Sequence, residues 1–322
     1  MSKQWRLAPV LAILMAVMMF VISACGGSTT TGSSGSGNNT TPTTGSTTTT
    51  SGGTSGTPGA YKCVQDNISI SGSTALYPLV NAVSNKYKAK CSGASFTITP
   101  NGSGTGLGQV ESGAVKIGMS DVYKKSAQAD LVDHQVAVVI FSLILNSKIT
   151  GVPNLTTAQL KDIYSGKTTN WNQVGGSDLK IVVVSRPSNS GTRQTFQSFI
   201  LGGPETVSGP SNLTTDSTGT VVKNVQQTDG AIGYVALSAA KSSGLKIAQI
   251  DGSAPSAEVV KNNTYKFWNF EHMYTKGPAS GLSQALIDYM GSDDGKQEAT
   301  TLSFVPISDM SSDAVASHTP KS

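Results

Sequence analysis

Three short turns in this 322-residue sequence combine hydroxyl side chains with glycine. They are residues 71–75 (SGSTA), 101–106 (NGSGTG) and 190–192 (SGT), and each separates an expected strand from an expected helix. Ser and Thr hydroxyls beside the unpaired N–H groups and positive dipole of a helix N-terminus suit an anion. Ser and Thr are also ordinary N-caps, so any one of these turns, taken alone, is better explained as a helix cap than as an anion site. Three such turns together predict an anion site.

Two charged residues lie at strand ends beside these turns. Arg186 follows the apolar run 181–184 (IVVV), and its guanidinium can donate hydrogen bonds to an oxyanion. Asp121 follows the run 116–119 and would repel an anion, so it requires a ligand that brings a proton. Phosphate carries such a proton near neutral pH and sulfate does not. Arg193 lies in a helix's first turn, where a cation is disfavoured; ligand contact, pairing with an acid and a solvated surface role all stay open.

Strands and helices alternate along the chain and would place these turns. Apolar spacing predicts strands at 67–71, 96–99, 116–119, 136–145, 181–184 and 231–235, and helices at 76–87, 103–113, 156–164, 192–200, 281–290 and 293–302. This alternation predicts an α/β fold with mainly parallel sheets. In such folds the turns that follow parallel strands meet at one sheet edge, where ligands bind.

The N-terminus has the pattern of an export signal. Lys3 and Arg6 precede an apolar run over 7–22, which ends in small residues and then Cys25. This pattern predicts a secretory signal peptide over 1–24, because the run is short for a membrane span; a single-pass anchor is the alternative. The small residues before Cys25 resemble a bacterial lipobox, which implies lipid modification of that cysteine. Residues 25–60 then form a Gly/Ser/Thr-rich tether that cannot bury a core.

Cys63 and Cys91 remain once Cys25 is assigned to lipid. In an exported protein such a pair is typical of a disulfide, which would stabilise the fold by roughly 3 to 4 kcal/mol. A pair of metal-binding thiols is the alternative, but no nearby His or third Cys supports it. We expect no metal and no cofactor, since the glycines at 102–108 match neither a dinucleotide fingerprint nor a Walker loop.

The charge balance excludes one class of partner. The chain has 23 Lys and Arg against 19 Asp and Glu, and the signal peptide takes two basic residues, which leaves a net charge of +2. No Lys/Arg cluster is interleaved with aromatic residues. We therefore expect no nucleic-acid partner.

Six segments in order resemble the phosphate-binding proteins of bacterial phosphate-specific ABC transporters. They are GSTALYPLV (72–80), NGSGTGLGQV (101–110), GMSD (118–121), LTTAQLKDIYSGKTTNW (155–171), SRPSNSGTRQTF (185–196) and DGAIGYV (229–235). The resemblance covers essentially the whole chain after the tether. It implies a two-lobed periplasmic-binding-protein-like fold in which each lobe is a mainly parallel sheet flanked by helices, closing over phosphate in the cleft between them.

The resemblance also implies the site and the lobes. Phosphate ligands would be Ser73, Thr74 and the N–H of Ala75, then Ser103 and Gly104, then Asp121 as proton acceptor, and from the other lobe Arg186, Ser190, Gly191 and Thr192. Lobe 1 would hold 61–142 and 238–322, and lobe 2 would hold 143–237, with chain crossings near 141–146 and 235–240. The weakest match is 265–273 (YKFWNFEHM), where relatives commonly have a Tyr-Pro and an Arg-containing strand.

The expected function is that of an extracytoplasmic lipoprotein, anchored to the cell membrane, that passes inorganic phosphate to an ABC permease and ATPase complex. The same fold could instead bind sulfate, molybdate or tungstate, or serve in adhesion or signalling. An extracellular serine hydrolase is the alternative from another class. No G-x-S-x-G motif supports it, and neither His134 nor His272 nor His318, which lies in the polar tail, is beside a candidate Ser. We therefore expect no enzyme, with His272 packed among aromatic residues.

Overall fold

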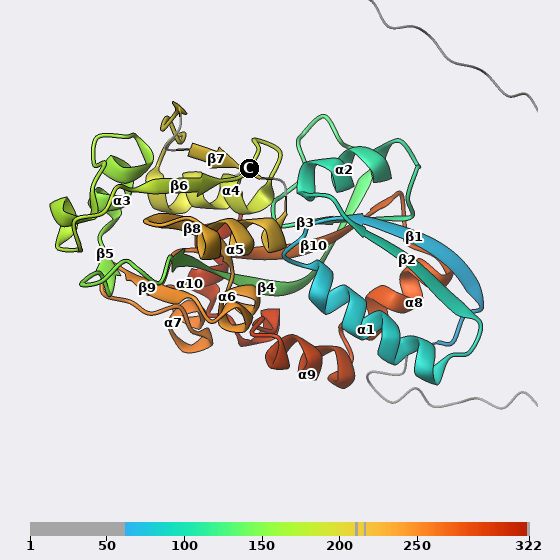
Figure 1. Cartoon of the computed structure of the whole chain (residues 1–322). Coiled ribbons are helices and arrows are strands. Elements are labelled where there is room, and N and C mark those ends of the chain that lie inside the picture. Colours follow the sequence, from blue (N-terminus) through green and yellow to red (C-terminus); the bar gives the residue numbers. More distant parts are fainter. Residues whose placement is uncertain (1–61, 210–211, 216, 321–322) are drawn as a thin grey trace, which may run out of the picture. The chain divides into compact units, whose positions relative to one another are not determined.

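The computed structural model describes residues 62–209, 212–215 and 217–320 (Figure 1). The predicted signal peptide, tether and lipidated Cys25 lie outside the described residues. The strands are β1 (Asp66–Gly72), β2 (Ala94–Pro100), β3 (Ile117–Ser120), β4 (Leu131–Leu145), β5 (Asn154–Leu155), β6 (Val182–Ser185), β7 (Asn212–Thr214), β8 (Ala231–Ala236), β9 (Lys246–Ile250) and β10 (Trp268–Lys276). The helices are α1 (Tyr77–Lys90), α2 (Ser103–Glu111), α3 (Thr157–Tyr164), η1 (Trp171–Val174), α4 (Gly191–Phe196), η2 (Gln197–Leu201), α5 (Thr218–Gln227), α6 (Leu237–Ser243), α7 (Ala257–Lys261), α8 (Gly281–Met290), α9 (Asp293–Thr301), η4 (Ile307–Asp309) and α10 (Ser312–His318).

The strands form a mixed sheet in the order β2-β1-β3-β10-β4-β8-β6-β7, with β9 paired to β4 and β5 paired to β9. β1 is parallel to β2 and β3, and β6 is parallel to β7 and β8. Between these two groups, β10 and β4 run antiparallel to their neighbours. Helices α1 and α8 lie along the first group and α4 and α5 along the second (Figure 1). The α/β fold is thus confirmed, with its parallel strands in two groups joined by an antiparallel centre.

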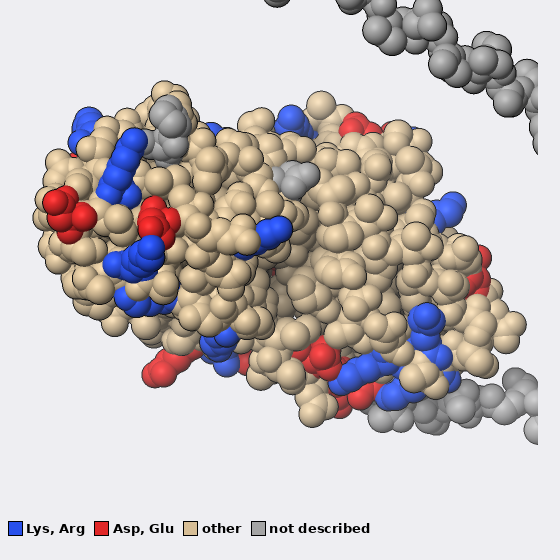
Figure 2. All heavy atoms as spheres, in the orientation of Figure 1, with Lys and Arg blue, Asp and Glu red and all other residues tan. Residues whose placement is uncertain are grey.

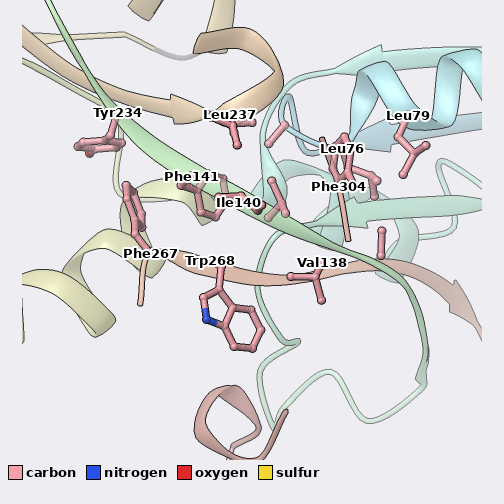
Figure 3. Packing of buried hydrophobic residues seen from close by; sticks show 14 of the residues in the cluster. Leu76, Leu79, Val138, Ile140, Phe141, Tyr234, Leu237, Phe267, Trp268 and Phe304 are labelled. Atoms are coloured by element: carbon pink, nitrogen blue, oxygen red, sulfur yellow. The ribbon is translucent and has the colours of Figure 1, made fainter. Parts of the chain in front are cut away.

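The long strand β4 joins the two groups of strands. Its first part pairs with β10, and its last residues, Phe141 to Leu145, pair with β8 and β9. Every residue from Ala137 to Leu145 is at most 1% exposed, as expected for a strand buried on both faces. Figure 3 shows the rings of Phe141, Phe267 and Tyr234 in this part of the core. The centroid of the Phe267 ring is 5.2 Å from that of Phe141 and 6.2 Å from that of Tyr234. One apolar core therefore continues along β4 from one group to the other.

Tight βα turns bring hydroxyl side chains to the ends of the parallel strands. Gly72 ends β1 with φ +136°, and a Cβ there would overlap the carbonyl oxygen of Met119 on β3. Only glycine fits this conformation and this approach. The N–H of the next residue, Ser73, donates to that same oxygen at 3.0 Å. The predicted turn after β1 is therefore hydrogen-bonded to β3.

The predicted disulfide is confirmed. Cys63 and Cys91 are bonded, with their Cα atoms 5.2 Å apart. Cys63 precedes β1 and Cys91 is the C-cap of α1, so the bond fixes the start of this βα unit to the end of its helix.

The weakly matching segment 265–273 forms much of β10, a strand that the sequence did not predict. All its residues from Trp268 to Thr275 are buried, and it is hydrogen-bonded to β3 and β4. The predicted packing of His272 is confirmed, since its ring is fully buried against Tyr123 and Tyr274. Its Nδ1 lies 2.8 Å from Oδ1 of Asp133.

The prediction that His318 lies in a polar tail is wrong. His318 ends helix α10 and is only 4% exposed. Its ring is stacked between those of Phe199 and Trp268, with centroid distances of 3.8 and 3.6 Å. The residues around it are mostly polar in sequence, but α10 has a buried side that includes Ala314.

Charged residues are few over the middle of the face in Figure 2. Blue and red spheres meet at its lower edge, where ion pairs join α1 to α9: Lys86 to Glu298 at 2.6 Å, and Lys90 to Asp294. Within the described residues, no helix is both long and apolar enough to cross a bilayer.

Candidate anion-binding site

The first turn, between β1 and α1, presents Ser73, Thr74 and Ala75. Ser73 is 1% exposed, and its Oγ accepts the N–H groups of Ala75 at 3.0 Å and Leu76 at 2.9 Å. The Ser73 oxygen thus holds the turn that precedes α1, while its hydroxyl hydrogen can still be donated to a ligand. The Ala75 N–H, in contrast, is bonded to Ser73 in this structure.

Thr74 is where three elements meet. Its Oγ1 accepts from Nη2 of Arg186 at 3.2 Å and shares a hydrogen bond with Oγ1 of Thr218 at 2.9 Å. Arg186 follows β6 and is 1% exposed, which confirms that this arginine is buried at a strand end. Thr218 begins α5 and was not among the predicted site residues. Residues 217–220 (STGT) repeat the Ser/Thr/Gly turn before a helix, and that pattern could have identified it.

The second turn, at the start of α2, lies against the end of β3. Ser103 is 1% exposed, and its Oγ accepts the N–H of Asp121 at 3.1 Å. The N–H of Gly104 donates to the carbonyl oxygen of Asn189 at 3.0 Å, so α2 contacts the loop after β6. Asn269 of β10 donates its amide to the Asp121 carbonyl oxygen at 2.8 Å. The backbone around Asp121 is therefore held from two sides.

The third turn, at the start of α4, meets the second one. Ser190 is the N-cap, and its Oγ accepts the N–H of Arg193 at 3.4 Å. Thr192 donates its hydroxyl to Oδ2 of Asp121 at 2.9 Å. A Cβ at Gly191 would overlap Ser103 Oγ and lie 2.8 Å from Cβ of Asp121. The turns before α2 and α4 can approach this closely because residue 191 is glycine.

Arg193, whose role the sequence left open, pairs with an acid. Its Nε lies 3.6 Å from Oε2 of Glu205, and its Nη1 donates to the carbonyl oxygen of Arg186 at 2.5 Å. Glu205 also accepts from the Tyr234 hydroxyl at 2.6 Å and from Ser185. Burial raises the pKa of Glu205, and these hydrogen bonds and the Arg193 charge partly offset that increase. The Arg193–Glu205 pair thus lies directly behind Arg186.

The assembled groups suit binding rather than hydrolysis. Hydroxyl donors and a buried guanidinium can surround a tetrahedral oxyanion, while Asp121 can accept one proton from it. His134 contacts Thr275 at 3.0 Å, and His272 and His318 are packed as described above, so none activates a turn serine. In the described ranges, no three His, Cys, Asp or Glu side chains are grouped to hold a metal ion.

Comparison with known proteins identifies the family. A family model described as a PBP superfamily domain matches residues 36–294. The phosphate-binding protein PstS of Bacillus subtilis is 41% identical over 249 residues, which are 76% of this chain and 82% of that protein. The chain belongs to the PstS phosphate-binding proteins of the PBP superfamily.

Solved structures agree with this membership. A candidate phosphate ABC transporter substrate-binding protein from Clostridium perfringens, solved with bound phosphate, is 31% identical and aligns with a TM-score of 0.71. An ABC-type phosphate transport receptor from Vibrio cholerae is 26% identical with a TM-score of 0.60. Each alignment covers 75% of this chain and 100% of the other protein. The fold class that the resemblance implied is therefore confirmed.

Proposed function

We propose that this protein binds inorganic phosphate outside the cytoplasm and delivers it to an ABC importer. The observation that carries the proposal is a buried acceptor among donors: Asp121, 2% exposed, holds Oδ2 against the Thr192 hydroxyl. An ionised carboxylate there favours a ligand that donates a proton. The names of its relatives in Bacillus subtilis and Clostridium perfringens support the same substrate.

The proposed ligands come from the three turns and two strand ends. They are Ser73, Thr74, Ala75, Ser103, Gly104, Asp121, Arg186, Ser190, Gly191 and Thr192. The N–H groups of Ala75 and Gly104 now donate to Ser73 and Asn189, so these two must exchange partners to reach phosphate.

Other oxyanions are disfavoured by the same carboxylate. Sulfate, molybdate or tungstate without a proton would place two negative charges in contact in a buried site. An unpaired buried charge costs several kcal/mol, which is enough for strong rejection.

Isothermal titration calorimetry against phosphate, sulfate and molybdate tests the substrate. We expect heat and saturation with phosphate and at least tenfold weaker binding of the other two, in line with the loss of one buried charge-assisted hydrogen bond, about 1.5 to 3 kcal/mol. Equal or tighter binding of sulfate or molybdate would reassign the protein to another oxyanion.

We also propose that the protein is a receptor and not an enzyme. The histidine contacts described above leave no base beside a turn serine. A phosphate-release assay with aryl and alkyl phosphate esters checks this, and turnover well above the uncatalysed rate would contradict it.

The proposed location is the outer face of the cell membrane, with Cys25 carrying the lipid and a permease and ATPase complex receiving phosphate. The leader pattern and lipobox of the sequence support this. Metabolic labelling with a fatty acid should mark the wild type and not Cys25→Ser. Phosphate uptake by cells that depend on this protein should fall in that variant if anchoring serves transport.

We further propose two lobes that meet along β4. We place the first crossing within the expected 141–146, a proposal supported by the change in the pairing of β4 from β10 to β8 at Phe141. For the return we propose 265–268 in place of 235–240, because β9 still pairs with the end of β4. The Phe141 N–H donates to the Phe267 carbonyl oxygen at 3.0 Å, so the two crossings would lie side by side.

A further inference from the structure

Glu271 of β10 and Asp121 come directly after the ladder in which β10 runs antiparallel to β3. The last pair of this ladder joins His272 to Ser120, and continuing its register by one position sets Glu271 against Asp121. The two side chains are in direct contact. Residues directly opposite on antiparallel strands project from the same face, with Cβ atoms about 4.5 to 5.5 Å apart. Asn269, two residues earlier on β10, already contacts the Asp121 carbonyl oxygen from this strand. Two carboxyl groups therefore share one face.

Both carboxyl groups are buried, since Glu271 is 0% and Asp121 2% exposed. Among the described residues, no N–H or O–H group reaches either oxygen of Glu271 or Oδ1 of Asp121. On its other side Glu271 is opposite Ala137 of β4, which is apolar. Two ionised carboxylates have no hydrogen to share, so a hydrogen bond between Glu271 and Oδ1 of Asp121 forms only if one group carries a proton.

Burial and the neighbouring charge indicate that Glu271 is the group that carries the proton. Burial first, and then the charge and direct contact of Asp121, raise the pKa of Glu271 well above its usual range. Asp121 is the charged group that acts on Glu271 within the described part of the chain, and no cation there offsets it. Like charges this close in a buried site do not both ionise.

We propose that Glu271 determines specificity by keeping its own proton and donating a hydrogen bond to Oδ1 of Asp121, which holds Asp121 ionised with Oδ2 toward the ligand. A hydrogen bond to the charged form of a carboxyl group favours that form. The proton that Oδ2 accepts must then come from the ligand, which restricts the site to oxyanions that carry one. Glu271 does not touch the ligand and acts as a positioning residue. The inference rests on the proposed function, because it explains how Asp121, the proton acceptor of the phosphate site, stays ionised.

Replacing Glu271 with Met removes the donor and keeps a side chain of similar length. Asp121 then loses the hydrogen bond that favours its charged form, and the neutral form, which acid favours in any carboxyl group, can donate to sulfate. At about pH 5.5, we expect the ratio of sulfate affinity to phosphate affinity to be about tenfold higher in Glu271→Met than in wild type. At about pH 8 we expect a smaller increase. Tenfold is the scale of one buried hydrogen bond to a charged group. Calorimetry with both anions at both pH values measures this.

Two variants separate this role from packing. Glu271→Gln keeps an N–H donor and should keep the wild-type ratio at both pH values. Met273→Leu perturbs the same buried strand without touching the proton and should also keep it. A purely structural role for Glu271 would lower both affinities by one factor and leave the ratio unchanged.

The outcomes are distinct. Wild-type protein that does not bind phosphate contradicts the proposed function itself. If wild type prefers phosphate to sulfate, and Glu271→Met shows the same preference as wild type at both pH values, the proposed role of Glu271 is wrong but the proposed function stands. If Glu271→Met does not fold, infrared spectra of wild type and Glu271→Gln decide. A protonated-carboxyl band at neutral pH that disappears in Glu271→Gln supports the proposal, and identical spectra overturn it.

Discussion

The hydroxyl of Thr192 donates to Oδ2 of Asp121 at 2.9 Å, and this bond joins the start of α4 to the end of β3. Both residues are at most 2% exposed. The carboxylate thus receives a neutral donor from the facing turn in a place with little solvent exposure. A ligand that enters between these turns must match an acceptor that is already oriented.

Asp121→Asn tests that acceptor. The amide is nearly isosteric and neutral, so it no longer repels a fully deprotonated oxyanion and can donate to it. We expect the preference for phosphate over sulfate to narrow by about tenfold or more, the scale of one buried charge-assisted hydrogen bond. Calorimetry with both anions measures the ratio. Asp162→Asn, at an exposed position in α3, is the control and should leave it unchanged. An unaltered ratio in Asp121→Asn would argue against proton acceptance.

Arg186→Ala tests the buried guanidinium. Arg186 donates to Thr74 and is 1% exposed, so its removal takes away a positive charge at the end of β6. We expect phosphate affinity to fall by more than tenfold, with Arg186→Lys intermediate because an ammonium lacks the planar fork. Lys180→Ala, an exposed cation just before β6, should change affinity little. Survival of wild-type affinity in Arg186→Ala would remove Arg186 from the site.

Gly191→Ala tests the close approach of two turns. The added methyl would overlap Ser103 Oγ and crowd Asp121, so the turns before α2 and α4 must separate. We expect phosphate affinity to fall by at least tenfold, since overpacking a tight contact costs about 1 to 3 kcal/mol. Gly108→Ala lies in α2 with open space around its Cβ position and should bind normally, with a small gain in stability. Equal phosphate affinity in Gly191→Ala and Gly108→Ala would mean that the close contact of Gly191 with Ser103 and Asp121 is not needed for phosphate binding.

The parts of the site that could be predicted are those with local causes. Ser73 and Ser190 follow from local bonds of a serine hydroxyl to N–H groups two or three residues later, and Arg186 follows from its position after an apolar run. The strand β10 was missed because its alternation of apolar and polar residues over WNFE (268–271) breaks at His272, and because strands distant in sequence bury both of its faces. The same distance hid the Glu271–Asp121 pair and the stacking of His318. Periodicity in the sequence reports which face of an element is buried and not what covers it.

Arg193→Gln tests the ion pair behind Arg186. It leaves Glu205 buried without its cation, and breaking a buried pair by removing one partner costs about 3 to 5 kcal/mol. Because Arg193 is partly exposed, we expect the lower end of that range in urea unfolding, together with weaker phosphate binding through the loss of its bond to the Arg186 carbonyl oxygen.

The double variant Arg193→Gln/Glu205→Gln should recover much of the lost stability, because it removes the unpaired charge as well. Lys167→Gln, which breaks an exposed ion pair with Asp162, serves as the control and should cost less than about 1 kcal/mol. A double variant no more stable than Arg193→Gln would show that the Arg193–Glu205 pair does not carry the effect.

His318 should make stability depend on pH. Burial between Phe199 and Trp268 lowers the pKa of His318 from 6.5 to about 4, and its hydrogen bond to the Lys266 carbonyl oxygen only partly opposes this. The folded state therefore holds the neutral ring, whereas the unfolded chain takes up a proton near pH 6.5. This stabilising contribution is complete above that value and is lost as the pH falls toward 4.

His318→Phe keeps an aromatic ring in the stack and removes the titration. Between neutral pH and pH 4, we expect the free energy of unfolding of wild type to fall by about 3 kcal/mol more than that of His318→Phe, the equivalent of a shift of between two and three pKa units. Urea unfolding at a series of pH values measures both curves. Other groups that titrate in this range act on both proteins and cancel in the difference. Parallel curves would mean that the ring of His318 is solvated in the folded protein, contrary to the stacking described above.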